Sequence, residues 1–396
     1  MKFNAISKSK VENTFNNMFI ESISLTKTSK TVVSQLYSYI KKGTEYVNEL
    51  NNGNIETKCF LTGNSSRIPK PNNFYYIPSQ IKQSIDKNSH YYVRIKSRIN
   101  DRDVILFFVE QNKSNARSMK KYNDYALKMF SWIYVLDKYA KDSCSTSLSV
   151  YVYLTAFKKL LPSHNQDLDM SHINTAFTTS CPVDAEITIY RREEWFKVFI
   201  HETFHSFGLD FAGITGDSCN ATLKTMFHLD IDYNAFEAYT ELWAEIINAI
   251  FCARDLINPK CKDFESNLLK TTEDIINVER QYSFIQMVKV LNHKGIRYID
   301  LINDNLNSTY SEKTNMFAYF VVKTLIIFNI NSFFTWCKSN NTNILQFDLL
   351  DNTSTAKFCT IVKKSYKHKE FLKNIEEAEK RKKKTPELRM TLSEMS

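Results

Sequence analysis

The stretch Glu194-Trp195-Phe196-Lys197-Val198-Phe199-Ile200-His201-Glu202-Thr203-Phe204-His205-Ser206-Phe207-Gly208 decides how this chain is interpreted. It contains the pattern H-E-x-x-H at His201, Glu202 and His205. Because residues four apart lie on one face of an α-helix, both imidazoles can bind one Zn²⁺ ion from the same side. Glu202 follows the first histidine and is placed to act as a general base toward a water on that metal.

The same stretch has the features of a buried helix. Two carboxylates, Glu193 and Glu194, precede it, where the positive end of the helix dipole favours them. Gly208 is a natural stop at the other end. The residues between them are apolar over a broad surface, which favours burial: Trp195, Phe196, Phe199, Ile200, Phe204 and Phe207. The alternative interpretation is a buried helix whose two histidines are only hydrogen-bonded.

Length and composition set the limits for the rest of the chain. With 396 residues, 43% of them hydrophobic, it has room for a large core and for two or three domains. The first thirty residues are polar and have no apolar leader segment. The eight cysteines are scattered without a C-x-x-C pair, which predicts free thiols in a reducing compartment. We therefore expect an intracellular, cytoplasmic protein that is not secreted.

The net charge of +9 is inflated by the basic run Lys380–Lys384. This run has no interleaved aromatic residues and no groove-reading motif, so nucleic acid is not an expected partner. The apolar run 315–337 is interrupted by Lys323, Asn329 and Asn331, and no uninterrupted part reaches about 18 residues. We expect a buried core helix there rather than a membrane span.

Secondary-structure patterns precede the H-E-x-x-H helix in a definite order. Residues 31–50 have a helical pattern, and residues 51–80, rich in Gly and Pro, predict an irregular connection. The predicted elements that follow are a β-hairpin over 91–99 and 104–110, a helix over 122–139, and strands over 149–155, 173–178 and 186–190. After the H-E-x-x-H helix, the chain is predicted to be mostly helical.

A row of glutamates lies downstream, in the predicted helix that starts near Asn234. Glu237, Glu241 and Glu245 are spaced by four and form a stripe along one face. Such a stripe is usually a solvated charged face. Here almost no Lys or Arg follows it at helical spacing, and like charges four apart repel, so the row favours a cation among its carboxylates. A catalytic zinc site needs a third protein ligand, and this row is the best supply.

His201-Glu202-Thr203-Phe204-His205 followed by Glu241-Leu242-Trp243-Ala244-Glu245 resembles the gluzincin metalloproteases, and the second motif is similar to that of their lethal-factor type. The wider stretch 173–211 is similar to metallopeptidase-like proteins of large DNA viruses. The resemblance implies an α+β, zincin-like fold of two lobes. Residues 86–210 would be the N-terminal lobe, 211–396 a helical C-terminal lobe, and 1–85 a partly helical segment without an assigned role.

The resemblance also implies the site. Zinc, one ion per chain, would bind His201, His205 and Glu241, with Glu245 behind the ligands. Glu237 fits the same spacing rule, so Glu237 as the ligand with Glu241 behind it stays open. Asn174, Thr175, Ala176 and Phe177 would form an edge strand that holds a peptide or protein substrate. Gluzincins add a Tyr or His that stabilises the oxyanion, and Tyr233, Tyr239, His228 and His293 are the candidates.

Three alternatives remain at this point. The metzincin pattern has a third ligand where this chain has Phe211, and Asp210 is one position early. A catalytically silent, zinc-containing virion or assembly protein would need no base at position 202. A hydrolase acting on a bond other than a peptide bond stays open. The expected function is a zinc metallopeptidase with Glu202 as its base, of open oligomeric state.

Overall fold

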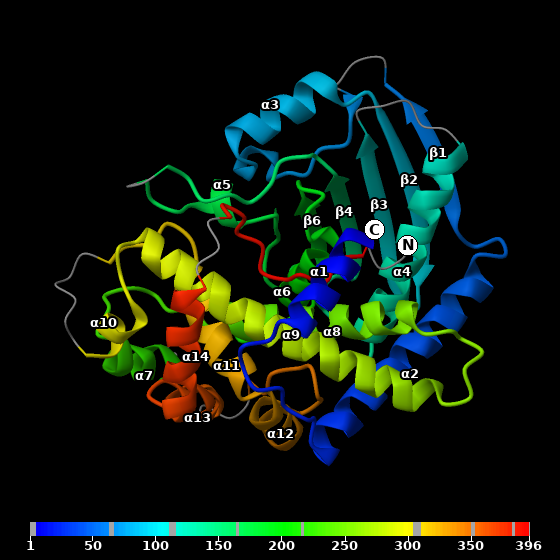
Figure 1. Cartoon of the computed structure of the whole chain (residues 1–396). Coiled ribbons are helices and arrows are strands. Elements are labelled where there is room, and N and C mark those ends of the chain that lie inside the picture. The colour runs from blue at the N-terminus through cyan, green and yellow to red at the C-terminus, as the bar shows by residue number, and fades with distance from the viewer. Residues whose placement is uncertain are drawn as a thin grey trace.

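The chain forms one mixed β-sheet with helices packed around it (Figure 1). The computed structural model describes residues 5–62, 67–110, 116–163, 166–214, 218–303, 310–349, 353–381 and 385–395. The α+β class predicted from the sequence is confirmed. Three residues of the predicted basic run, 382–384, lie outside the described residues.

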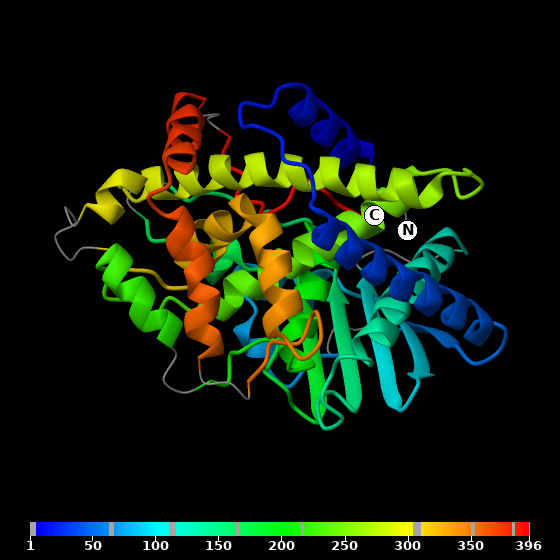
Figure 2. The same ribbon diagram turned by 90° about the horizontal axis from the view of Figure 1, so that it is seen from below.

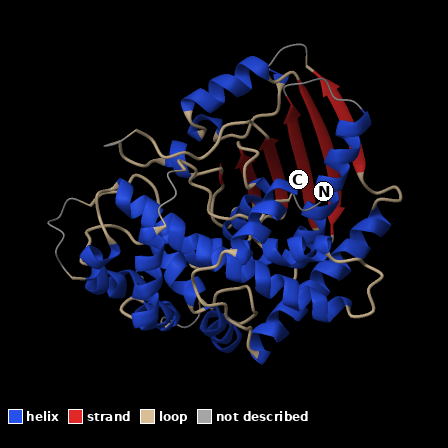
Figure 3. Ribbon diagram, in the orientation of Figure 1, coloured by secondary structure: helices blue, strands red, loops and turns tan. Residues whose placement is uncertain are grey.

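The sheet has six strands in the order β1-β2-β3-β4-β6-β5. Strands β3, β4 and β6 are parallel, and the others pair antiparallel. Figure 3 shows the strands gathered on one side of the molecule and helices on the other. The strand bounds are β1 (Glu56–Leu61), β2 (Tyr91–Ile99), β3 (Arg102–Glu110), β4 (Ser147–Tyr153), β5 (Ala176–Phe177) and β6 (Asp184–Ile189).

The helices make up most of the remaining chain, and the longest, α9, crosses the molecule in the view of Figure 2. Their bounds are α1 (Ala5–Asn16), α2 (Lys27–Leu50), η2 (Phe74–Tyr76), α3 (Ser79–Asn88), α4 (Ala116–Leu136), α5 (Met170–Ile173), α6 (Trp195–Ser206), α7 (Ser218–Phe227), α8 (Ala235–Leu256), α9 (Phe264–His293), α10 (Tyr298–Ile302), η3 (Phe317–Val322), α11 (Lys323–Phe328), α12 (Ile330–Asn340), α13 (Ser354–Ser365) and α14 (Lys369–Lys380).

The predicted hairpin is confirmed, and its register runs from Tyr91 opposite Glu110 to Ile99 opposite Arg102. The predicted irregular connection over 51–80 is wrong in one part, because it contains β1. This strand lies at one edge of the sheet and is mostly exposed, so it lacks the alternation of apolar and polar residues that marks a half-buried strand.

The strand predicted over 173–178 is also shorter than expected. Only Ala176 and Phe177 pair with β6, as the other edge of the sheet. The residues before them form the short helix α5, whose start is capped by the Asp169 side chain accepting the backbone N–H of Ser171. This cap competes with an extended conformation.

The expectation of free thiols is wrong for four cysteines. Cys144 is bonded to Cys181 and Cys219 to Cys359. Each pair is far apart in the sequence, and the fold brings the two Cα atoms to 4.6 Å and 5.3 Å, within the range that a disulfide spans. The other four cysteines, Cys59, Cys252, Cys261 and Cys337, take part in neither disulfide.

The apolar run 315–337 is buried, as predicted, but it is not one helix. It forms the π-helix η3, then α11, then α12 after a bend of 90° at Asn329. Among the described helices, none is by itself long and apolar enough to cross a membrane, and only the bent pair 317–328 and 330–340 reaches that length and composition together.

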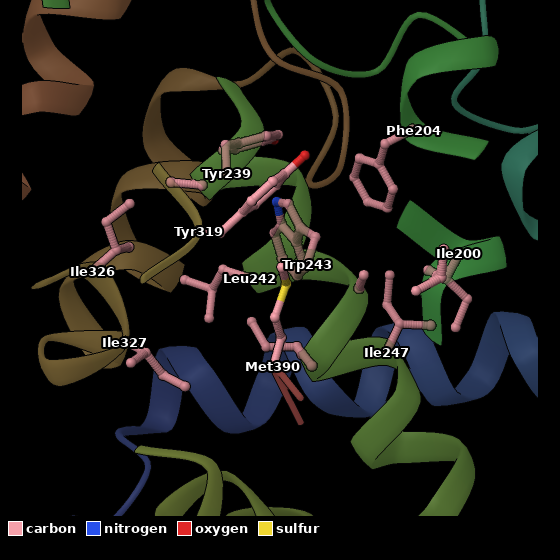
Figure 4. Close-up of a cluster of buried hydrophobic side chains, with 14 of the residues drawn as sticks. Ile200, Phe204, Tyr239, Leu242, Trp243, Ile247, Tyr319, Ile326, Ile327 and Met390 are labelled. Carbon is pink, nitrogen blue, oxygen red and sulfur yellow. The ribbon is translucent and has the colours of Figure 1, made fainter. Parts of the chain in front are cut away.

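Helices α6 and α8 pack against each other under the sheet and carry both sequence motifs. Figure 4 shows the apolar cluster around them, with Ile200 and Phe204 of α6 facing Trp243 and Ile247 of α8. Tyr319 of η3 and Met390 reach into the same region. The motif residues are therefore held in a tightly packed part of the core.

Met390 belongs to the segment 385–395, which threads through the interior. Glu194, which precedes α6, accepts the backbone N–H groups of Met390 and Thr391, and Glu279 of α9 accepts those of Leu392 and Ser393. These four residues are almost completely buried. The segment is thus fixed against the start of the H-E-x-x-H helix.

Candidate metal centre

Helix α6 carries His201, Glu202 and His205 close to the molecular interior. The three side chains are about two to three helical turns from its start, and His201 and Glu202 are only 5% and 6% exposed. The helix ends as the sequence predicts. Gly208 has a φ of +66°, and Leu209 N–H donates to the carbonyl of Phe204, which closes the helix end with a left-handed glycine.

The two imidazoles and one carboxylate form a small triangle of donor atoms. Nε2 of His205 lies 3.1 Å from Nε2 of His201. Oε2 of Glu237 lies 3.2 Å from Nε2 of His201 and 3.4 Å from Nε2 of His205. Donors bound at about 2.0–2.1 Å to a tetrahedral ion are about 3.3 Å apart. The triangle therefore has the size that a metal ion requires, and this buried group could hold one.

The third member of the triangle is Glu237, whereas the resemblance implied Glu241. Glu237, one helical turn earlier, is the residue of the alternative that the sequence left open, and its carboxylate is the one grouped with the two histidines. The reason is the packing of α8 on α6, which brings the first turn of α8 beside the imidazole Nε2 atoms. Glu241 lies one turn deeper and reaches only the far side of His201, 3.0 Å from Nδ1.

Both histidines have a carboxylate on the ring nitrogen that faces away from the triangle. Glu241 stands beside Nδ1 of His201, although the two are not aligned for a regular hydrogen bond. Asp210 is hydrogen-bonded to Nδ1 of His205 and accepts the backbone N–H of Ala212. Such partners fix the ring and the tautomer, which leaves Nε2 free for a metal.

Asp210 is the functional residue that sequence reasoning misjudged. The sequence presents Asp210 only as a third metal ligand one position too early for the metzincin pattern. The left-handed turn at Gly208 sends the chain back along α6, so that Asp210 meets His205 from behind. Phe211, which occupies the metzincin ligand position, is buried in the core at 2% exposure.

The glutamate stripe is compensated after all, by cations from other helices. Lys197 of α6 donates to Glu241 at 2.6 Å, and Lys323 of α11 donates to Glu245 at 2.8 Å. The resemblance implied that Glu245 stands behind the histidine ligands. Its carboxylate instead pairs with Lys323, and among the described residues it contacts no histidine. Glu237 differs from the other two glutamates because, among the described residues, it pairs with both imidazoles and with no lysine. The side-chain amide of Asn315 donates to its Oε1.

The electrostatics of the triangle favour a positive charge at its centre. Burial lowers the pKa of His205, but the Asp210 and Glu237 carboxylates outweigh it and raise the pKa well above its usual value. The pKa of His201 is raised in the same way by Glu237 and Glu241, against the effect of burial. The pKa of Glu237 is lowered, because both imidazoles overcome the cost of its burial.

Glu202 faces a cavity rather than a partner. Among the described residues, no side chain or backbone N–H donates to its carboxylate, and burial raises its pKa. The cavity has a volume of about 20 Å³, room for about one water molecule. Its lining includes His201, Glu202, Lys197, Tyr319 and Met390.

Tyr319 lies where a hydroxyl beside the metal would be useful, and it was not among the four candidates named from the sequence. Its hydroxyl donates to Oε2 of Glu237 at 3.0 Å. Burial raises the pKa of Tyr319 well above its usual value, so the hydroxyl stays protonated. The sequence placed it only in an apolar run, and the π-helical turn that aims it inward has no sequence signal there.

The four named candidates lie elsewhere, and their contacts show why. Tyr233 donates to the carbonyl of Leu229 and Tyr239 to that of Leu345. His293, at the end of α9, contacts the carbonyl of Gln166, and His228 follows the end of α7. None of the four lines the cavity beside Glu202.

The predicted substrate strand lies partly at the site. Asn174, Thr175 and Ala176 line the cavity with Glu202, whereas Phe177 packs against Tyr76 and Tyr190 on the far side. The backbone carbonyl of Asn174 accepts from the Arg191 guanidinium, and that of Thr175 accepts the N–H of Tyr190. Pairing with an added strand is thus left to Ala176 and Phe177.

No protein-family model, curated protein or solved structure matches this chain.

Proposed function

We propose that the protein is a zinc-dependent metallopeptidase. One observation carries the proposal: His201, which forms the donor triangle with His205 and Glu237, lines a cavity that fits one water molecule, and the cavity is also lined by Glu202, whose carboxylate has no hydrogen-bond donor among the described residues. Two imidazoles and a carboxylate form a common ligand set of catalytic zinc, which needs a further position for water. A site with only a structural role would need no base at that cavity.

Each group has a defined part in peptide hydrolysis. When bound, Zn²⁺ would lower the pKa of a water and polarise the scissile carbonyl. Glu202 removes a proton from the attacking water as the new C–O bond forms, and its raised pKa suits it to hold that proton. It then delivers the proton to the amine nitrogen as the C–N bond breaks. The Tyr319 hydroxyl donates to the oxygen that becomes negative.

Recognition of the substrate is assigned to the short edge strand. Ala176 and Phe177 lie at the edge of the sheet, Ala176 lines the cavity, and an extended peptide could pair with this strand. This strand is only two residues long, with Ala176 buried and Phe177 partly buried. We therefore propose that main-chain pairing supplies register at the scissile bond more than it supplies affinity.

Metal content and a peptide library test the proposal together. The purified protein should contain one zinc per chain, His201→Ala should lose it, and Glu202→Gln should keep it while losing cleavage of the library. Glu273→Gln is the matched control, because Glu273 is as buried as Glu202 but lies on α9 and accepts the N–H of Leu25. It should cleave like the wild type.

Two results would contradict the proposal. Absence of a transition metal after mild purification would remove the site itself. Equal cleavage by the wild type and Glu202→Gln would assign the activity to a contaminant. A zinc-loaded wild type that leaves the library intact would favour the silent virion or assembly component that the sequence also allowed.

A further inference from the structure

Lys197 is a buried cation that neither sequence motif includes. It lies on α6 one turn before His201, so both side chains project from the same face of the helix. Lys197 is only 2% exposed. Burying a charged lysine raises the free energy of the folded state unless a carboxylate pairs with it. The partner of Lys197 therefore indicates its role.

That partner is Glu241, which links Lys197 to the metal ligands. Nζ of Lys197 donates to Oε1 of Glu241 at 2.6 Å, and Oε2 of the same carboxylate lies 3.0 Å from Nδ1 of His201. The three side chains form a chain of contacts from lysine to carboxylate to imidazole. The lysine thus holds the far oxygen of a carboxylate whose near oxygen faces a metal-ligating ring.

We propose that Lys197 is a positioning residue of the metal centre. It fixes Glu241 beside Nδ1 of His201, which keeps the proton of the ring on Nδ1 and turns Nε2 toward His205 and Glu237. Among the described residues, Lys197 is the lysine that forms an ion pair with Glu241, so without it the carboxylate loses the contact that holds Oε1 and can turn away from the ring. The inference rests on the metal-binding part of the proposed function and needs no peptidase activity.

The chain supplies a matched pair for the test. Lys323 and Glu245 form an ion pair of the same chemistry one turn further along α8, at 2.8 Å and with side chains as buried as those of Lys197 and Glu241. Lys323 also donates to Ser283. The carboxylate of its partner Glu245 contacts no histidine among the described residues. This second pair reports mainly what a buried ion pair contributes to folding, because the charge of Lys323 acts on Glu241 more weakly than that of Lys197 does.

The experiment compares Lys197→Met with Lys323→Met. Zinc affinity is measured by competition with a chromophoric chelator, and thermal stability is measured on the same metal-free samples. Both variants should lose stability, because each leaves a buried carboxylate without its lysine. Lys197→Met should also bind zinc about 10–100-fold more weakly, the usual effect of removing support behind a ligand. Lys323→Met should stay within about threefold of the wild type.

A double variant guards against a misfolded single variant. Glu241→Gln should itself weaken zinc binding, and adding Lys197→Met to it should cause little further loss, because the lysine acts through that carboxylate. Equal zinc affinity of wild type and Lys197→Met would overturn the inference, as would additive losses in the double variant. A wild type that binds no zinc would overturn this inference and the proposed function together, whereas a zinc-binding but inactive wild type would overturn only the latter.

Discussion

The carboxylate of Glu237 contacts the two imidazoles, a tyrosine hydroxyl and an asparagine amide. Its Oε2 atom lies within 3.4 Å of both imidazole Nε2 atoms and accepts the hydroxyl of Tyr319, while Oε1 accepts the amide of Asn315. An oxygen held by donors on one side and two imidazoles on the other has little freedom to move. We infer that the orientation of Glu237 is set before any metal arrives.

The three glutamates of the stripe should therefore differ in their effect on zinc. Glu237→Ala removes a ligand and should reduce affinity most, beyond 100-fold. Glu241→Ala removes the partner of His201 and should cost about 10–100-fold. Glu245→Ala should change affinity little, because its partner is Lys323. Chelator competition measures the order, and a larger loss in Glu241→Ala than in Glu237→Ala would contradict the ligand assignment.

Tyr319→Phe removes one hydroxyl and keeps the ring in place. We expect kcat to fall about 10²–10³-fold, as for loss of a donor to a developing oxyanion, with zinc still bound. Tyr233→Phe is the control, since among the described residues its hydroxyl is hydrogen-bonded to the backbone of Leu229, away from the cavity. Steady-state kinetics on a library-derived peptide distinguish the two, and an unchanged kcat in Tyr319→Phe would remove the tyrosine from the mechanism.

At the residue scale, the sequence predicts the site residues that lie on one helix. It does not predict the contacts that residues of other segments make with them. His201, Glu202 and His205 share one helix, so their spacing alone places them together. The choice between Glu237 and Glu241 depends on how far α8 slides along α6, which a spacing rule does not fix. Asp210 and Tyr319 reach the site through a glycine turn and a π-helical turn, and neither has a periodic signal.

The element that carries Tyr319 has its own anchor. Glu312 accepts the backbone N–H of Phe317, the first residue of η3, and the hydroxyl of Tyr310. Burial raises the pKa of Glu312 to about 7. A carboxyl whose pKa is raised by folding stabilises the folded state fully at pH values below its unfolded pKa. That contribution is lost as the pH rises through the folded pKa.

We therefore expect Glu312 to make the protein less stable as the pH rises from about 4.5 to about 7. Each pKa unit corresponds to about 1.4 kcal/mol, so the contribution is about 3 kcal/mol at most. Glu312→Gln should remove this part of the pH dependence, whereas Glu370→Gln, at the start of α14, should retain it. Denaturant unfolding between pH 4.5 and 8 measures it, and parallel curves for Glu312→Gln and the wild type would contradict the expectation.

Elements with strong periodicity were predicted well, and short edge elements were not. The hairpin β2–β3 and the helices α2 and α4 each bury one face, which leaves its period in the sequence, whereas α6 and α8 are buried on nearly every side and are marked by their apolar composition. Strand β1 is exposed on both faces, and β5 has only two residues, so their existence depends on neighbouring strands. The bend after α11 depends on packing, because Asn329 interrupts an otherwise apolar run without proline or glycine.

On the scale of the whole molecule, one disulfide joins distant parts of the chain. Cys219 of α7 is bonded to Cys359 of α13, 140 positions further along the sequence. A bridge that closes so long a loop restricts the unfolded chain strongly, typically by about 2–4 kcal/mol. Both helices lie in the part of the molecule away from the sheet, and neither supplies a residue of the donor triangle.

Cys359→Ser should therefore lower the free energy of unfolding by about 2–4 kcal/mol and leave zinc affinity unchanged. Cys261→Ser is the control, because Cys261 is a free thiol and its loss should have a small effect. Chemical denaturation of oxidised protein measures both. Equal stability of Cys359→Ser and the wild type would show that the bridge does not form in solution.

The other disulfide has a practical consequence for every assay of this protein. Cys181 donates its backbone N–H to the carbonyl of His205, and a side chain at Gly208 would meet the sulfur of Cys144, so the Cys144–Cys181 bridge supports the end of the helix that carries His201 and His205. Dithiothreitol both reduces disulfides and binds zinc through its thiolates. Inactivation by such a reagent would mix two causes that dipicolinate or a phosphine reductant, applied one at a time, would separate.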